Sequence, residues 1–391
     1  MNSPARSLIG QTIVDDGPIS FETFMEIALY SEVGYYRNED VFGIAGDYYT
    51  SPHIHPIFAS ICALQVEKMW KAMDQPAPFF IMEQGAGDAT LAKDVLEAIS
   101  ILNQDLYSSL TYICVDRRKI EIDDNSHIEI VQSNQLEPFH RTGVIISNEL
   151  IDSFPVKMIE IRDRKIFEIY VGINSRGSFE EILVPIAIDD YMDFLPSKIE
   201  QLNGYRGPLN TKMDDWYSNI SDALNCGFVI TIDYGFDREV FFSMEKSHRL
   251  LQTYYKHIDG SNPFQRIGSQ DITAHVDFDT LKQSGHKHGF KECGYFSQAE
   301  WLNSMGLDKL LCKMRADGLE NRNTINLISA LNDISGLGGF KVLIQGKNVE
   351  HFDVRDLNSD VFWPPGLEFP QVKNVHMSNA RKPETWETNF F

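Results

Sequence analysis

FFIMEQGAGDATL, residues 79–91, joins an apolar run to a helical pattern through two glycines that stand one residue apart. The apolar part predicts a buried strand, and TLAKDVLEAI, which begins at Thr90, predicts a helix. A strand that ends at a glycine turn and continues as a helix directs backbone N–H groups and the helix N-terminus at one point. The stretch therefore predicts that a polar or anionic ligand binds at the turn.

Apolar runs alternate with helical segments through most of the chain. The strand-like runs are PFFIMEQ, LTYICVD, HIEIVQS, GVIISNE and GFVITIDYG, followed near the C-terminus by FKECGYFSQ and GFKVLIQG. Strands that alternate with helices indicate an α/β fold with a mainly parallel sheet and helices on both faces. In that architecture ligands bind at the carboxyl ends of the strands.

The chain is expected to contain three regions. The first is helical, because FETFMEIALY, with Ser20 as its N-cap, and IFASICALQVEKMWKAM both have helical spacing. The last has few periodic features and is expected to lie on the surface or to fray. The predicted bounds are 1–77 for the helical region, 78–349 for the α/β core with insertions at about 156–225 and 236–276, and 350–391 for the tail.

Composition excludes several classes of function. The 391 residues include 35 Lys and Arg against 56 Asp and Glu, a formal charge of −21, so a nucleic-acid partner is disfavoured. The 5 cysteines are scattered and form no C-x-x-C pair, which argues for reduced thiols and against a zinc module or a disulfide framework. His53 and His55 form an H-x-H pair, but no further ligands complete a metal site, so no metal is predicted.

The N-terminus, MNSPARSLIG, lacks the apolar region of a secretory signal, and no apolar run approaches the length of a membrane span. We expect a protein of the cytoplasm, or of an organelle matrix if the source is eukaryotic, although no clear transit peptide is present. No membrane insertion is expected. A homodimer is left open.

The residues around the glycine turn favour one class of cofactor. A dinucleotide site needs G-x-G-x-x-G, and here Thr90 stands in place of the third glycine. Glu83 precedes Gly85 and Gly87, where a carboxylate would hold an ammonium group, and Asp116 ends the next strand, where it would accept hydrogen bonds from a ribose diol. This pair of acids fits S-adenosylmethionine (SAM) better than NAD. The alternative is that the turn is only a tight turn and Asp116 a surface acid.

A longer set of motifs resembles a known family. The segments GPISFETFMEIALY, GYY, GDYYTSP, MEQGAGDATL, SNELIDSFPV, VITIDYG, DITAHVDF and SQAEWL, in this order, closely resemble the MidA family of SAM-dependent methyltransferases over about residues 17–345. That family includes a mitochondrial arginine methyltransferase needed for assembly of respiratory complex I. The resemblance implies a class I methyltransferase fold, Rossmann-like with a seven-stranded sheet, an N-terminal helical region and an inserted lobe.

The front loop of the chain, GDYYTSP, is expected to fold over the cofactor and exclude water. Gly46, Asp47 and Thr50 are its candidate cofactor-binding residues, and Asn148 is a further one at the end of a later strand. The sequence departs from the family pattern at Asp88-Ala89, where relatives commonly carry a glycine. It also departs at Ser51-Pro52-His53, a position often acidic in relatives, so whether His53 takes part in catalysis stays open.

Three side chains are candidates for catalysis. Glu149 follows the strand GVIIS, and Asp152 would share its face if the segment turned helically. A pair of carboxylates suits a guanidinium group, which presents five donors in a planar fork. In the alternative, Glu149 caps a helix and Asp152 is solvated. His275 in DITAHVDF has the side chain whose ordinary pKa suits base catalysis, or it is a structural histidine.

The predicted function is SAM-dependent methyl transfer to a protein arginine by in-line displacement. A small-molecule O- or N-methyltransferase is the closest alternative, and would favour a closed apolar pocket over an acidic groove. A non-catalytic assembly factor that retains the fold is an alternative of another class. A NAD(P) oxidoreductase is disfavoured by the absent third glycine.

Overall fold

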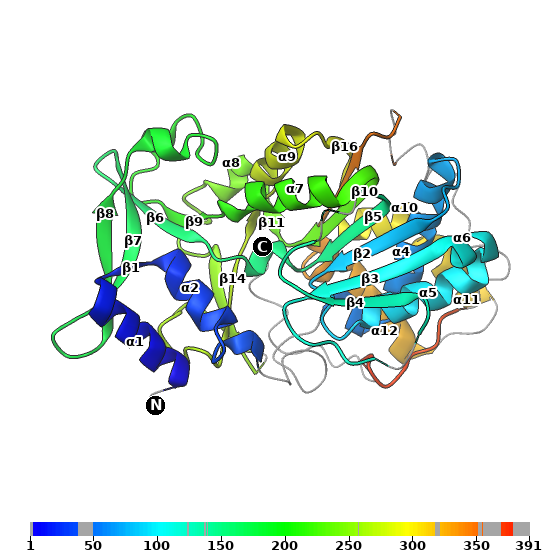
Figure 1. The fold of residues 1–391 in the computed structure, drawn as a ribbon, viewed down its shortest axis with the longest axis horizontal. Coiled ribbons are helices and arrows are strands. Elements are labelled where there is room, and N and C mark those ends of the chain that lie inside the picture. Colours follow the sequence, from blue (N-terminus) through cyan, green and yellow to red (C-terminus); the bar gives the residue numbers. More distant parts are fainter. Residues whose placement is uncertain are drawn as a thin grey trace. The chain divides into compact units, whose positions relative to one another are not determined.

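The computed structural model of the chain contains two compact units (Figure 1). Unit 1 comprises residues 1–41, 151–215 and 235–284, and unit 2 comprises residues 42–150, 216–234 and 285–391. The structure describes residues 3–37, 50–122, 125–136, 138, 140–256, 258–316, 321–350, 354 and 369–377.

Unit 2 is built on a seven-stranded sheet in the order β16-β17-β10-β5-β2-β3-β4. Strands β10, β5, β2, β3 and β4 are parallel to one another, whereas β17 is antiparallel to both of its neighbours. The predicted class, a mainly parallel α/β sheet of seven strands, is confirmed. The strands are β2 Phe79–Gln84, β3 Leu110–Asp116, β4 Ile128–Gln132, β5 Arg141–Asn148, β10 Leu224–Asp233, β16 Lys291–Ser297 and β17 Lys341–Lys347.

The order of the strands reverses beside β2. The chain passes from β2 outward to β3 and β4, then returns to the other side of β2 to form β5 and continues outward to β10. The carboxyl ends of β2 and β5 therefore form a topological switch point, where open α/β sheets bind their ligands. Glu83 lies near the end of β2, and Asn148 ends β5.

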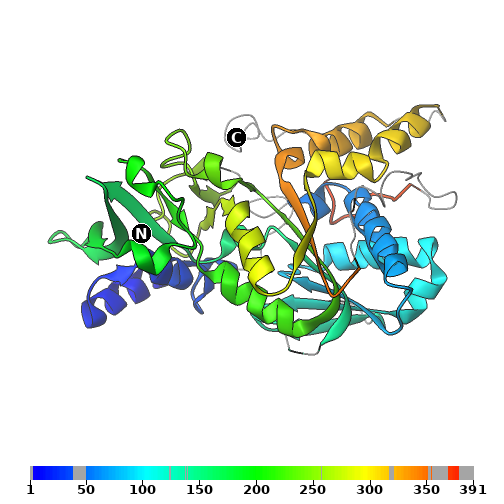
Figure 2. The same cartoon turned by 90° about the horizontal axis from the view of Figure 1, so that it is seen from above.

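Helices cover both faces of the unit 2 sheet. Helices α4 and α5 pack on one face through a continuous apolar core (Figure 2). On the other face Tyr217, in the end of α7 that belongs to unit 2, donates a hydrogen bond to Gln345 of β17. The helices of unit 2 are α3 Ser51–Ile54, α4 Ile57–Ala72, α5 Thr90–Leu102, α6 Gln104–Ser109, α10 Gln298–Ser304, α11 Leu307–Ala316 and α12 Arg322–Asn332. Two further helices, α7 Lys212–Ala223 and α9 Phe278–Lys287, begin in unit 1 and end in unit 2.

Unit 1 combines two N-terminal helices with antiparallel strands. Its largest sheet has the order β1-β7-β6-β9, and β8 pairs with β7. The hydroxyl of Ser20 accepts a hydrogen bond from Thr23 N and so caps α2 as predicted. The elements are α1 Pro4–Asp16, β1 Ile19–Ser20, α2 Phe21–Tyr30, β6 Lys157–Arg162, β7 Lys165–Ile173, β8 Phe179–Pro185, β9 Arg206–Leu209, β11 Gly235–Phe236, α8 Arg238–Phe241, β12 Leu251–Tyr255, β13 Ile258–Gly260, β14 Asp271–Ala274 and β15 Val276–Asp277.

The expectation of a surface tail holds for only some of the C-terminal residues that the structure describes. His376 is fully buried, and its Nε2 lies 2.7 Å from Asp94 Oδ2 on α5. His376 and Met377 therefore pack on unit 2, whereas residues 371–375 are exposed as expected. The sequence pattern did not reveal this because the packing depends on single side chains and not on a periodic face. The predicted domain bounds stay predictions.

Candidate active site

The glycine turn after β2 has the backbone that its sequence requires. Gly85 and Gly87 have φ of 76° and 61°, in the left-handed region that favours glycine. A side chain at Gly85 would also press on Leu150, whose Cδ1 would lie 3.0 Å from the new Cβ. The turn leads directly into α5, so its N–H groups and the start of that helix lie together.

Asp116 at the end of β3 holds the turn in place. Its Oδ2 accepts a hydrogen bond from Gly87 N at 2.9 Å, and its Oδ1 accepts one from Arg118 N at 2.8 Å. Oδ1 also accepts a longer hydrogen bond from Arg118 Nε at 3.4 Å. Oδ2 has a second lone pair for a further donor. Asp116 ends its strand as predicted, and its predicted contact with a ribose stays a proposal.

Glu83 is buried on the face of the sheet that carries Tyr112, whose hydroxyl donates to Glu83 Oε2 at 2.8 Å. The pKa of Glu83 is raised to about 8, chiefly by burial. The hydrogen bond from Tyr112 works against this shift, and the negative charges of Asp88 and Asp116 contribute to it. Between pH 4.5 and 8, the folded protein therefore holds a proton on Glu83, whereas the unfolded chain, in which Glu83 has its ordinary pKa of 4.5, has released it.

That proton makes folding stability depend on pH. The stabilisation is complete below pH 4.5 and is lost as the pH rises through 8. We expect the free energy of unfolding of Glu83→Gln to exceed that of the wild type increasingly across this range, by roughly 1 kcal/mol per pH unit. Denaturant unfolding at several pH values measures it, with the exposed Glu121→Gln as control. If the free energies of unfolding of Glu83→Gln and the wild type changed with pH in parallel, Glu83 would have an ordinary pKa in the folded protein.

A hydrogen-bonded chain that the sequence did not predict joins the front loop to the turn. Thr50 Oγ1 lies 2.8 Å from His53 Nδ1, and His53 Nε2 lies 3.2 Å from Asp88 Oδ2. The other oxygen of Asp88 accepts from Thr90 N at 3.0 Å and so caps α5. Burial would raise the pKa of Asp88, but its bond to His53 and the charge of that ring outweigh burial and lower it.

Both ring nitrogens of His53 have a partner in this chain of contacts, Thr50 on Nδ1 and Asp88 on Nε2. His53 therefore positions Asp88 in the glycine turn. The residue pair Asp88-Ala89, noted as a departure from the family pattern, supplies the partner of His53, and Ala89 takes the left-handed conformation with φ of 61°. The only sequence signal for this contact was that both segments depart from the family pattern.

Asn148 and Glu149 close the switch point at the end of β5. Glu149 Oε1 accepts from Ser51 N at 3.3 Å and from Asn148 Nδ2 at 3.2 Å. Glu149 has φ of 51°, which costs a residue with a side chain about 1–2 kcal/mol. Among the residues described, no donor reaches the buried Oδ1 of Asn148. A buried acceptor without a donor fits a ligand that brings an N–H or O–H group.

Asp152 and His275 belong to unit 1. Asp152 lies in a short 3-10 helix, Ile151–Ser153, and is buried. The helical turn that would have placed Asp152 on the face of Glu149 does not form, because Glu149 is left-handed. Their catalytic roles stay predictions.

His275 is fully packed within unit 1. Its Nδ1 lies 3.3 Å from the carbonyl oxygen of Leu250, and its ring stacks on Phe236 at 5.2 Å between centroids. Burial lowers its pKa to about 4; the contact with Leu250 works against this shift, and the charge of Lys246 adds to it. These contacts suit the structural alternative named above.

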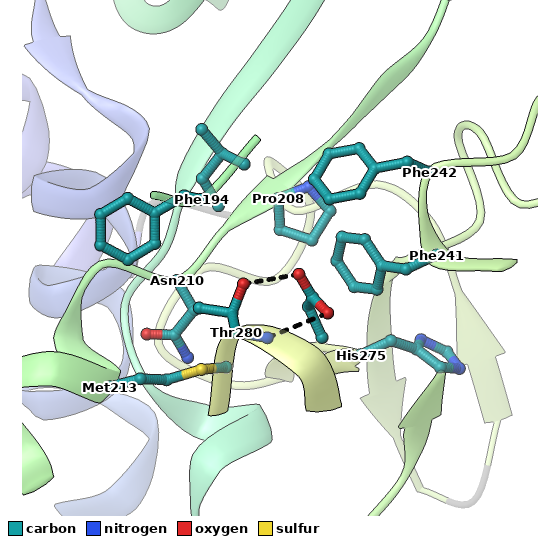
Figure 3. A pocket seen from close by; sticks show the side chains of 10 residues that line it. Phe194, Pro208, Asn210, Met213, Phe241, Phe242, His275 and Thr280 are labelled. Carbon is teal, nitrogen blue, oxygen red and sulfur yellow. Dashed lines mark hydrogen bonds between the residues drawn. The ribbon is translucent and has the colours of Figure 1, made fainter. Parts of the chain in front are cut away.

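A small pocket of unit 1 lies beside His275 (Figure 3). Its volume is about 10 Å³, which is the space of about one water molecule. The aromatic side chains Phe194, Phe241 and Phe242 line it, and Asp277 is held there by hydrogen bonds from Thr280. A pocket of this size admits no amino-acid side chain.

Gly46 and Asp47 lie outside the described residues, so their predicted contact with the cofactor stays a prediction. Within the described ranges, no cluster of three or more His, Cys, Asp or Glu side chains has the arrangement of a metal site. Every helix of the described part is too short or too polar to cross a bilayer.

The fold, with its glycine turn and strand-end acids at the switch point of a seven-stranded sheet, defines a SAM-dependent methyltransferase. Residues 61–296 match the model of the family described as "Putative S-adenosyl-L-methionine-dependent methyltransferase", and the chain belongs to this family. The predicted membership, the enzyme class and the cofactor are thereby confirmed.

Relatives and solved structures agree with this assignment. A Drosophila melanogaster protein named "Protein arginine methyltransferase NDUFAF7 homolog, mitochondrial" is 25% identical over 381 aligned positions, covering 87% of this chain and 85% of the relative. The Rattus norvegicus "Protein arginine methyltransferase NDUFAF7, mitochondrial" is 34% identical over 332 positions, covering 76% and 72%. A Burkholderia thailandensis protein crystallised with S-adenosyl-homocysteine shares the fold, with a TM-score of 0.77, 24% identity, and coverage of 90% and 93%.

Proposed function

We propose that the chain methylates an arginine side chain of a protein substrate. The observation that carries the proposal is the geometry of Glu149, whose carboxylate is held by Ser51 N and Asn148 Nδ2 at the carboxyl end of β5. A residue kept in a left-handed conformation at a ligand-binding edge is typical of functional sites. The names of the Drosophila and rat relatives, both arginine methyltransferases, support the choice of acceptor.

The residues at the switch point fit the cofactor. Asp116 would accept hydrogen bonds from the ribose hydroxyls, and the Gly85–Gly87 turn allows close approach to its backbone. Asn148 Oδ1, which needs a donor, would accept a hydrogen bond from the ammonium group. Glu83 would bind the ammonium group in its ionised form, because a cation beside a carboxyl group lowers the pKa of that group. When bound, SAM supplies a methyl group on a positively charged sulfur.

Glu149 would hold and orient the acceptor. A carboxylate accepts two N–H bonds from a guanidinium and fixes its plane, and alignment of the attacking nitrogen is the main requirement of an in-line displacement. An arginine side chain loses its proton only above pH ~12, so a nearby carboxylate also helps to remove the proton of the attacking nitrogen. Contributions of Asp152, His275, Gly46, Asp47 and Thr50 remain predictions.

Isotope-labelled SAM tests the acceptor. We expect the purified protein to transfer the label to arginine in peptides or proteins from a cell extract, and to leave matched peptides with lysine in place of arginine unlabelled. Mass spectrometry of intact peptides and of metabolites measures both outcomes. Label found only in metabolites would contradict the arginine proposal and favour a small-molecule methyltransferase.

Calorimetry with SAM completes this test. If the wild type failed to bind SAM at millimolar concentration, the site would lack cofactor function and a non-catalytic assembly factor would be favoured. The cytoplasmic or organelle-matrix location stays a prediction, and a homodimer stays open. The names of the relatives place those proteins in mitochondria.

A further inference from the structure

Residues 369–377, which we call the C-terminal clasp, lie against α3 and α5 of unit 2 (red in Figures 1 and 2). Met377 N donates to the carbonyl oxygen of His53 at 2.8 Å. Phe369 contacts the ring of His55 with 5.3 Å between ring centroids. The clasp thus binds the segment that carries His53, although it follows that segment by more than three hundred residues.

The clasp also binds α5 through two side chains that converge on Asp94. Lys373 Nζ lies 2.6 Å from Asp94 Oδ1, and His376 Nε2 lies 2.7 Å from Asp94 Oδ2. The side chain of Asp94 is 5% exposed and that of His376 is fully buried. Burial alone would raise the pKa of Asp94, but the bonds from His376 and Lys373 lower it. A carboxylate this buried needs partners, and the clasp supplies two of them.

The hydrogen bonds fix the tautomer of His376. Its Nδ1 accepts a hydrogen bond from Lys373 N at 2.9 Å, so this nitrogen carries a lone pair. The proton is therefore on Nε2, which donates it to Asp94. His376 acts here as a hydrogen-bond donor to Asp94 within a defined turn of the clasp.

Both elements that the clasp binds flank the glycine turn. Asp94 lies one helical turn into α5, which begins directly after Gly87-Asp88-Ala89. The ring of His53, whose carbonyl oxygen the clasp binds, contacts Asp88 in that turn. A continuous path of contacts therefore runs from Met377 through His53 to Asp88 and on to Thr90 N.

We propose that the C-terminal clasp positions the glycine turn for the cofactor, with Lys373 and His376 as its positioning residues. The proposal rests on the placement of SAM at this turn. Because the clasp holds α5 and the His53 segment together, less of the protein has to become ordered when SAM binds. The clasp thereby raises the affinity for SAM without contacting the cofactor.

Two single substitutions test the clasp. Lys373→Met keeps the aliphatic stem and removes the ammonium, and His376→Leu removes the donor to Asp94. We expect each to raise the Kd for SAM and for S-adenosyl-homocysteine by roughly 2- to 30-fold, the range for residues that act through a contact network. The KM for SAM should rise in parallel, while kcat at saturating SAM stays close to that of the wild type.

Rescue and control variants separate positioning from general stability. His376→Gln keeps an N–H donor where Nε2 stood, so its Kd should return toward the wild-type value. Lys71→Met removes a lysine that lies 2.6 Å from Glu67 on α4 and should leave the Kd unchanged. Calorimetry is run at a temperature where unfolding curves show each variant to be folded. If His376→Leu does not fold, Lys373→Met carries the test.

The outcomes distinguish the clasp from the site on which it depends. A wild type that fails to bind SAM overturns the placement of the cofactor. A wild type that binds, together with folded Lys373→Met and His376→Leu variants that bind equally well, overturns the clasp alone. A lower melting temperature with an unchanged Kd also overturns it, because that is the result of a purely structural contact.

Discussion

Replacing Glu149 by glutamine is expected to lower kcat for arginine methylation by about 10²- to 10⁴-fold, the range for loss of a positioned acid–base group. The Kd for SAM should change little. Glutamine has nearly the same shape and keeps an oxygen that accepts from Ser51 N and Asn148 Nδ2. It loses the negative charge that pairs with a guanidinium. Single-turnover assays with labelled SAM measure the rate, and calorimetry measures cofactor binding.

A second substitution separates charge from backbone strain. Glu149→Gly removes the side chain and adopts φ of 51° without penalty, so it should be as inactive as Glu149→Gln and still fold. Glu121→Gln, which removes an exposed carboxylate elsewhere in unit 2, should retain full activity. Glu149→Gln with wild-type kcat would show that another residue holds the acceptor.

The sequence predicted those parts of the site that depend on local pattern. The alternation of strands and helices, the two glycines after β2, and the acids near or at the ends of β2 and β3 all follow from residues within a few positions of one another. A strand end and a glycine turn are encoded locally. For this reason the strand pattern alone was enough to predict that Asp116 ends its strand, whereas its hydrogen bond with Gly87 N became known only from the structure.

Contacts between segments that are far apart in the sequence could not be predicted from local sequence patterns. His53 meets Asp88 across 35 positions, and His376 meets Asp94 across 282. No periodicity marks these pairs, because each rests on one polar side chain that the fold places opposite another. The left-handed conformation of Glu149 was also unpredictable, since glutamate gives no signal for positive φ in the way that glycine does.

Asp116→Ala is expected to weaken SAM binding by about 10- to 100-fold, since hydrogen bonds to a charged group contribute about 1.5–3 kcal/mol each. The loss has two sources. The carboxylate fixes the turn through Gly87 N at 2.9 Å, and it would accept the ribose hydroxyls directly. Isothermal calorimetry with SAM measures the total effect, and Asp105→Ala, at an exposed acid of α6, is the control.

A cofactor analogue divides the two sources. We expect the wild type to bind S-adenosyl-homocysteine more tightly than its 2′,3′-dideoxy analogue, and Asp116→Ala to bind both with nearly equal affinity. The difference between the two proteins is the coupling free energy between the carboxylate and the ribose hydroxyls. If Asp116→Ala kept the preference of the wild type for the diol, Asp116 would act only by holding Gly87, and the ribose would have to be bound by another residue of the switch point.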